Sequence, residues 1–387
     1  MRAKQHIPSK IALAIPMLDE WENLSALLYR ISRQTLPSFS VYVCVNQPDA
    51  WWSDGSSDHL AVCQHNQLTL QALGTLDSSD HFSLSLIDRS SQGLGWKGKK
   101  KGVGWARKEL FARILEENDE GCVIVSMDAD TDFDADYLER VRDAFSHNPT
   151  LSALSVPYYH PLTGIEQMDR PLLRYECYMR HYLIQLLKIN NDYAFSALGS
   201  AMAFPVWAYR KAGGMNPLQG GEDFYLMQRF VKTGSISLDF NSVVRPSGRP
   251  SHRVPFGTGP AVAMSLSIQE SHYPFYPPVG FAAVKATFDL FPDLYFADKE
   301  TPMSDFLRKQ LATEDLWGPL RKNFKSQDLF VHACKERVDG LRILQFLKTF
   351  PLDFHIPVSF AFSPLDELMQ FRDSLFHEEM SLRLRKN

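Results

Sequence analysis

Carboxylates follow a strongly apolar segment in the first half of the chain. Residues 122–126 (CVIVS) contain three consecutive β-branched residues and lead into Met127-Asp128-Ala129-Asp130-Thr131-Asp132. A short apolar run of this kind is typical of a buried parallel strand. Because side chains alternate along an extended chain, Asp128 and Asp130 are expected to project to the same side where the strand ends. Two hard oxygen ligands at that place suit a divalent cation that also binds phosphate oxygens.

A structural role is the main alternative for this pair of aspartates. Either of them could cap the helix that the pattern of residues 135–145 predicts. Asp132 and Asp134 are closer to that helix and can fill the capping role instead. We therefore favour metal and phosphate binding by Asp130 and Asp128.

The segments before this strand predict the sheet that positions it. Strands are expected at 11–17, 40–45 and 82–87, and helical lengths of chain separate them. This alternation predicts an α/β fold with a mostly parallel sheet covered by helices on both faces. Ligands bind at the carboxyl ends of such strands. The segments that should converge there are 16–20, 46–49, 89–101 and 128–132, with Pro16, Glu20, Asn46, Lys97, Lys101 and Asp128 as candidate binding residues.

A glycine-rich basic turn follows the third predicted strand. Residues 93–98 (GLGWKG) fit the GxGxxG pattern of dinucleotide-binding turns, although they do not follow the first strand, and Lys97, Lys99, Lys100 and Lys101 crowd their end. A basic, glycine-rich turn before a helix suits anionic phosphate, whichever nucleotide carries it. The alternative is a solvated loop whose lysines only increase solubility.

Two acids in the second half follow a pair of glycines. Gly220 and Gly221 precede Glu222 and Asp223, which begin a predicted helix that ends at about Val231. Glycine lets the backbone approach a ligand closely, and a carboxylate there could act as a general base. Acids in a first helical turn also stabilise the helix dipole by less than about 1 kcal/mol, so a purely structural role remains open.

The segment 245–260 reads as a basic loop. It contains Arg245, Arg249, Arg253 and His252 together with three glycines. The arginines could clamp a diphosphate and the imidazole of His252 could bind a metal, or the arginines could pair with surface acids for little energy.

The composition is that of a globular protein and points to a soluble, cytoplasmic one. The chain has 387 residues, 44% of them hydrophobic and 22% charged, with a net charge of −4. The charge gives no reason to expect nucleic acid as a partner. Five scattered cysteines without CxxC spacing favour free thiols in a reducing compartment and leave zinc without a ligand set. We expect neither a signal peptide nor a transmembrane segment.

Taken together, these motifs resemble the family 2 glycosyltransferases of the GT-A fold. The matching segments are 15–20 (IPMLDE), 102–107 (GVGWAR), 128–130 (DAD) and 221–223 (GED). The resemblance implies a GT-A catalytic domain over 1–259, and 260–387 is then a mainly helical C-terminal extension that could shape the acceptor site or form a homodimer interface. The QxxRW motif of processive synthases is absent, which favours transfer of a single sugar.

The resemblance also implies an activity of the EC 2.4 class. The donor would be a nucleoside-diphosphate sugar, with a UDP-sugar favoured over a GDP-sugar, and the acceptor a hydroxyl of a glycan, a lipid-linked sugar or a small molecule. Asp130 would bind Mn²⁺ or Mg²⁺, Asp128 the ribose or the metal, and Arg107 the donor. Asp223, beside Glu222, would be the base of an inverting transfer. Asn46-Gln47-Pro48-Asp49 departs from the family's DDGS, for which residues 53–58 (SDGSSD) are a displaced candidate.

Two other functions fit parts of the same pattern. A nucleotidyltransferase acting on a sugar phosphate would use the same combination of phosphate and metal, but the glycine-rich, arginine-containing loop that such enzymes have after the first strand is missing. A catalytically silent glycan-binding or scaffold protein would not need the acids at 128, 130, 222 and 223.

Overall fold

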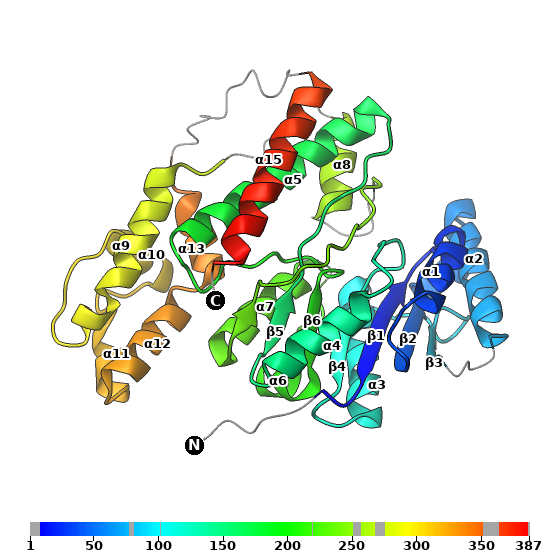
Figure 1. Ribbon diagram of the computed structural model, residues 1–387, viewed down its shortest axis with the longest axis horizontal. Helices are drawn as coiled ribbons and strands as arrows, with labels where there is room; N and C mark the ends of the chain where they lie inside the picture. The colour runs from blue at the N-terminus through cyan, green and yellow to red at the C-terminus, as the bar shows by residue number, and fades with distance from the viewer. Residues whose placement is uncertain are drawn as a thin grey trace. The chain divides into compact units, whose positions relative to one another are not determined.

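The computed structural model describes residues 8–76, 81–100, 102–218, 220–250, 257–267, 275–350 and 364–385 (Figure 1). These residues form two compact units. One comprises the described residues within 1–172 and 195–269, and the other those within 173–194 and 270–386. The helix α5 (Glu166–Lys188) begins in the first unit and continues into the second.

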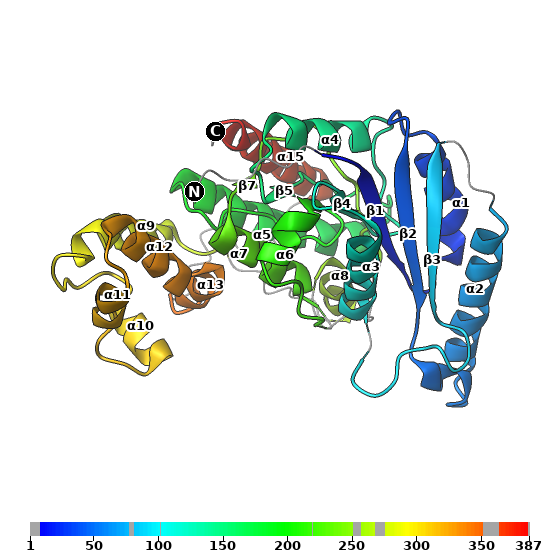
Figure 2. The same cartoon turned by 90° about the horizontal axis from the view of Figure 1, so that it is seen from below.

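The first unit contains a single mixed sheet, whose longest strands stand side by side in Figure 2. Its strand order is β3-β2-β1-β4-β6-β5-β7. The pairs β1 with β2, β1 with β4, and β2 with β3 are parallel, whereas β6 runs antiparallel to β4 and β5. The strands are β1 (Ile11–Met17), β2 (Phe39–Asn46), β3 (Phe82–Arg89), β4 (Val123–Ser126), β5 (Ala153–Ser155), β6 (Met202–Pro205) and β7 (Ile236–Ser237).

Pro16 is tolerated in β1 because the neighbouring strand β4 ends before it. Ala14 O accepts a hydrogen bond from Met127 N at 3.0 Å, so the even-numbered residues of β1 direct their backbone groups toward β4. The pairing of β1 with β4 ends at Ala14 and Ser126. Pro16 therefore lies where no ladder hydrogen bond from its nitrogen is required.

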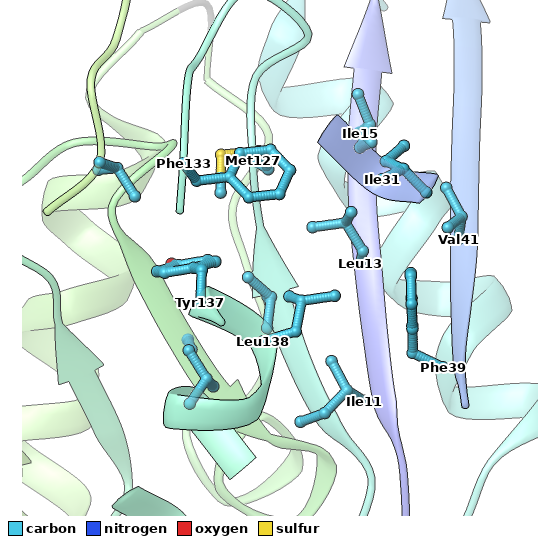
Figure 3. Packing of buried hydrophobic residues seen from close by; sticks show 14 of the residues in the cluster. Ile11, Leu13, Ile15, Ile31, Phe39, Val41, Met127, Phe133, Tyr137 and Leu138 are labelled. Carbon is cyan, nitrogen blue, oxygen red and sulfur yellow. The ribbon is translucent and has the colours of Figure 1, made fainter. Parts of the chain in front are cut away.

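The alternation of β1 separates the two faces of the sheet. Ile11, Leu13 and Ile15 belong to a buried cluster that also contains apolar residues of α1 (Trp21–Ser32) and α4 (Tyr137–His147) (Figure 3). The small residues Ala12 and Ala14 lie on the opposite face of the strand, and α3 (Val103–Glu117) packs against β1. The other helical elements of this unit are η1 (Asp49–Trp52), α2 (Ser57–Gly74), α6 (Val206–Lys211), α7 (Glu222–Thr233) and α8 (Thr258–Ser267).

The second unit is helical in its described residues. The part of α5 that belongs to it pairs with α15 (Leu365–Arg383) through buried charge: Arg180, wholly buried, bonds Glu176 of its own helix and Glu379 of α15. Complete pairing is what allows charges to be buried at acceptable cost. The remaining helices are α9 (Pro278–Leu294), α10 (Ser304–Leu311), α11 (Gly318–Asn323), α12 (Gln327–Arg337), α13 (Gly340–Leu347) and α15 (Leu365–Arg383).

The fold class expected from the sequence is confirmed: a mostly parallel sheet flanked by helices, with a mainly helical C-terminal region. One local expectation differs: α8 begins at Thr258, inside the segment 245–260 that the sequence predicted as a basic loop. Pro260 did not prevent this helix, because proline is tolerated in a first helical turn.

Two further observations concern composition. All five cysteines are free and buried, as the sequence predicted for the thiols. Among the described residues, no helix combines the length and the apolar character that a membrane crossing requires.

Candidate active site

The carboxyl ends of β1, β2 and β3 are tied together by one side chain. Asn46, the last residue of β2, donates from Nδ2 to Met17 O at 2.8 Å and accepts from Trp96 Nε1 at 3.0 Å. Asn46 is buried, so these two bonds fix the end of β1 against the loop that follows β3. The predicted convergence of these segments is confirmed.

The loop after β3 packs at Gly95 against the loop after β2. Two backbone hydrogen bonds join Trp96 to the loop after β2. Asp49 N donates to Trp96 O at 3.0 Å, and Trp96 N donates to Gln47 O at 2.9 Å. A Cβ on Gly95 would lie 2.7 Å from Asp49 Cα, so only glycine permits this approach. α3 begins at Val103, so the GxGxxG match of residues 93–98 does not lead directly into a helix.

The lysines of this turn are presented to solvent. The side chain of Lys97 is 72% exposed, and its Nζ lies 4.0 Å from Asp49 Oδ2. Lys99 and Lys100 are also exposed, and Lys101 lies outside the described residues. The turn therefore offers positive charge to a ligand at the surface rather than within the protein core.

Asp128 and Asp130 lie in the turn that follows β4. α4 has Asp136 at its N-cap position, so neither aspartate caps that helix, and the capping alternative for them is wrong. Asp128 Oδ1 lies 2.6 Å from Arg107 Nη2, and Asp130 Oδ2 lies 3.1 Å from Arg249 Nε. Asp132 and Asp134, which the sequence offered as caps, pair instead with Arg30 and Arg245.

Arg107 on α3 bridges two acids that are distant in sequence. Its Nη1 donates to Glu222, the first residue of α7, while Nη2 binds Asp128. The guanidinium passes over Gly199, where a Cβ would lie 2.1 Å from Nη2. Arg107 and Glu222 are both buried, so each supplies the counter-charge that the other requires.

Asp223 stands next to this ion pair. Gly221 adopts φ +72°, a left-handed conformation that favours glycine, immediately before the two acids. Burial and then the negative charge of Glu222 raise the pKa of Asp223 to about 7, against the opposing effect of Arg107. A carboxylate with a pKa near neutrality can both accept and return a proton under ordinary conditions.

The other predicted binding residues occupy different environments. Pro16 is buried within β1, and Glu20 forms an ion pair with Arg249. His252 and Arg253 lie outside the described residues, so metal binding by His252 and diphosphate binding by Arg253 stay predictions.

The residues that could hold a divalent cation are Asp130 and Asp128. Both are hard oxygen donors, and each already faces a guanidinium, so both positions accept positive charge. Within the described ranges, no group of three or more His, Cys, Asp and Glu side chains is arranged as a complete metal site. Two protein carboxylates fit a cation that takes its other ligands from phosphate and water.

Three features of the site were missed from the sequence. The pairing of Arg107 with Glu222 joins residues 115 positions apart, and Gly199 matters only because that guanidinium passes over it. Asp19 adopts φ +57°, and its Oδ1 accepts a hydrogen bond from His65 Nδ1 at 2.8 Å. The only local signal for these features was the small-residue segment around Gly199.

The displaced acidic segment at 53–58 has a local role. Ser56 caps α2 by accepting from His59 N at 3.3 Å, and Asp54 binds Ser56 N at 3.0 Å and His59 Nδ1 at 2.5 Å. These contacts explain the segment as a helix-capping turn.

Comparison with known proteins gives structural neighbours only. No family model matches the chain, and no curated protein sequence matches it. Among solved structures, mannosyltransferase PcManGT from Pyrobaculum calidifontis in complex with GDP-Man and Mn²⁺ is 15% identical, with coverage of 84% of this chain and 86% of that one and a TM-score of 0.38. S. aureus TarS 1–349 in complex with UDP-GlcNAc is 12% identical, with coverage of 97% and 90% and a TM-score of 0.41. At these TM-scores, function has to be argued from the chain's own residues.

Proposed function

We propose that this protein is an inverting, metal-dependent glycosyltransferase that moves one sugar from a nucleoside-diphosphate sugar to an acceptor hydroxyl. The observation that carries the proposal is the bridge made by Arg107. One buried guanidinium joins Asp128, beside the predicted metal ligand Asp130, to Glu222, beside the candidate base Asp223. The same side chain thereby connects groups suited to a donor diphosphate with groups suited to an acceptor proton.

The proposed reaction assigns a separate task to each side of the bridge. The acceptor oxygen attacks the anomeric carbon, the bond from that carbon to the diphosphate breaks, and Asp223 takes the acceptor's proton. Asp130, with Asp128, would hold Mn²⁺ or Mg²⁺, which stabilises negative charge on the departing diphosphate. Attack from the face opposite the leaving group gives inversion.

The chain's cations have matching roles in this proposal. Arg107 fixes the side chains of Asp128 and Glu222, so we assign it a positioning role rather than direct contact with the donor. Arg249 and the exposed Lys97 supply positive charge for the diphosphate, as Lys101 and Arg253 are also predicted to do. Asn46 is assigned to positioning as well, because its amide already binds Met17 and Trp96.

The proposal of a nucleotide donor is supported by the position of the candidate residues at one edge of the sheet. The loops after β1, β2, β3 and β4 all lie at the carboxyl edge of parallel strands, which is where α/β folds bind nucleotides. All described residues assigned here lie within 1–259, the predicted catalytic domain. A UDP-sugar is favoured over a GDP-sugar as the donor.

Calorimetric titration with UDP-sugars and GDP-sugars, with and without Mn²⁺, tests this proposal. We expect one nucleotide series to bind in the presence of Mn²⁺ and the Asp130→Ala variant to lose that metal dependence. Asp143→Ala is the matched control, since Asp143 lies on the exposed side of α4 and pairs with Arg142. Donor binding that needs no metal and is unchanged in Asp130→Ala contradicts the metal assignment.

A further inference from the structure

Arg249 binds the carboxylate of Asp130, which is the group that the predicted metal would need. It forms an ion pair with Glu20, and its Nε lies 3.1 Å from Asp130 Oδ2. Glu20 is buried, and its second oxygen accepts from Asn23 Nδ2 at 2.7 Å. The guanidinium is thus held between two carboxylates, one anchored at the end of β1 and the other after β4.

The backbone keeps Arg249 in this place. Arg245 and Asp132 exchange two backbone hydrogen bonds, at 2.8 and 2.9 Å, which fasten the segment before Arg249 to the aspartate turn. A Cβ on Gly248 would lie 2.2 Å from Leu172 Cδ2, so glycine lets this segment pack closely beside Arg249. Arg249 is therefore held in the site by the backbone contacts of its own segment.

Guanidinium and divalent cation compete for the same oxygen donor. Asp130 is only 17% exposed, which leaves little room for both positive groups beside it. The partner that can draw an arginine away from a carboxylate is a phosphate, which accepts two parallel hydrogen bonds from the guanidinium fork. A nucleoside diphosphate supplies such a partner and brings ligands for the metal at the same time.

We propose that Arg249 couples metal binding to diphosphate binding by holding Asp130 until the diphosphate arrives. Arg249 then exchanges Asp130 for a phosphate, and Asp130 becomes available to the metal. This inference rests on the proposed function and adds an order to it: the metal alone binds weakly, and metal and nucleotide strengthen each other. Coupling between two ligands is reciprocal and is typically about 5- to 150-fold.

Mn²⁺ binding measured by electron paramagnetic resonance, without nucleotide, tests this coupling directly. We expect wild type to bind Mn²⁺ weakly and Arg249→Gln to bind it at least about 5-fold more tightly, because the guanidinium that competes for Asp130 Oδ2 is removed. Arg249→Lys retains a positive charge and should stay close to wild type. Arg245→Gln is the matched control, since Arg245 lies on the same segment but pairs with Asp132 and Asp134.

The same titrations in the presence of UDP or GDP, corrected for Mn²⁺ bound by free nucleotide, complete the test. Wild type should gain Mn²⁺ affinity from one nucleotide, and Arg249→Gln should gain less. Where wild type binds nucleotide with Mn²⁺ through Asp130, either of two results overturns the inference. One is equal Mn²⁺ affinity in wild type and in Arg249→Gln. The other is an increase in Mn²⁺ affinity in Arg249→Lys as large as that in Arg249→Gln. Failure of wild type to bind UDP and GDP under any condition overturns the proposed function instead.

Discussion

The guanidinium of Arg107 and the carboxylate of Glu222 form an ion pair whose side chains are only 4% and 2% exposed. The pair joins α3, which covers one face of the sheet, to the first turn of α7. Removing one partner of such a pair leaves an uncompensated buried charge, whereas removing both does not. Substitutions in this ion pair are therefore expected to change both the stability of the protein and its activity.

Arg107→Met should destabilise the protein by about 3–5 kcal/mol, because Glu222 loses the buried guanidinium with which it forms an ion pair. The double variant Arg107→Met with Glu222→Gln should recover much of the loss. Denaturant unfolding measures both. Arg113→Met is the control, since the exposed pair of Arg113 with Glu117 should contribute no more than about 1 kcal/mol. Equal losses at Arg107 and Arg113 would refute the buried-pair interpretation.

Asp223→Asn should lower kcat by about 100- to 10,000-fold while donor binding persists, because the variant lacks the proton acceptor. Wild-type activity should rise with pH through about 7, where Asp223 becomes ionised. In Glu222→Gln the midpoint should move to lower pH, because the neighbouring negative charge is gone. A pH–rate profile whose midpoint is the same in both proteins counts against Asp223 as the base.

Asp223 should also make stability depend on pH. Its folded pKa of about 7 lies above the ordinary value for an aspartate, so its contribution to stability is fully present at pH below about 4 and is lost as pH rises through 7. Asp223→Asn should therefore be more stable than wild type at pH 8 and similar to it near pH 4. Thermal unfolding at the two pH values checks this, with the exposed Asp289→Asn as control. A uniform offset at both pH values speaks against the raised pKa.

Gly199→Ala should reduce both stability and activity. The added methyl would meet the Arg107 guanidinium at 2.1 Å and force it to move, with an overpacking cost of about 1–3 kcal/mol. Gly74→Ala, at the end of α2, meets nothing within 4 Å and should change stability by less than about 1 kcal/mol. Unfolding and turnover measurements on both variants decide the matter, and full activity in Gly199→Ala excludes the role given to Arg107.

The sequence predicted those parts of the fold whose signals are local. β1 was located residue for residue, because an apolar run followed by an acid cluster has few other interpretations. The antiparallel direction of β6 was not predicted, since it depends on where the chain returns to the sheet and not on the residues at 202–205. The helix start at Thr258 was not predicted, because basic and glycine residues favour a loop in the sequence pattern.

The candidate site was predictable to a similar extent. Asp128, Asp130 and Asp223 were found from motifs, because each follows an element end that the sequence marks. The ion pairs around them were not predicted: Arg107 was expected to bind the donor, and the structure pairs it with Asp128 and Glu222. Such pairings depend on tertiary contacts between distant residues, which no local pattern encodes.

Release of nucleoside diphosphate is the most direct test of the proposed activity. Purified protein is incubated with a panel of UDP-sugars and GDP-sugars in Mn²⁺, with and without simple glycan acceptors, and free UDP or GDP is quantified. We predict release from one nucleotide series, increased by an acceptor and lost in Asp223→Asn, although that variant still binds the donor. No release from any donor, or release of pyrophosphate when nucleoside triphosphate and sugar phosphate are supplied instead, would contradict a glycosyltransferase.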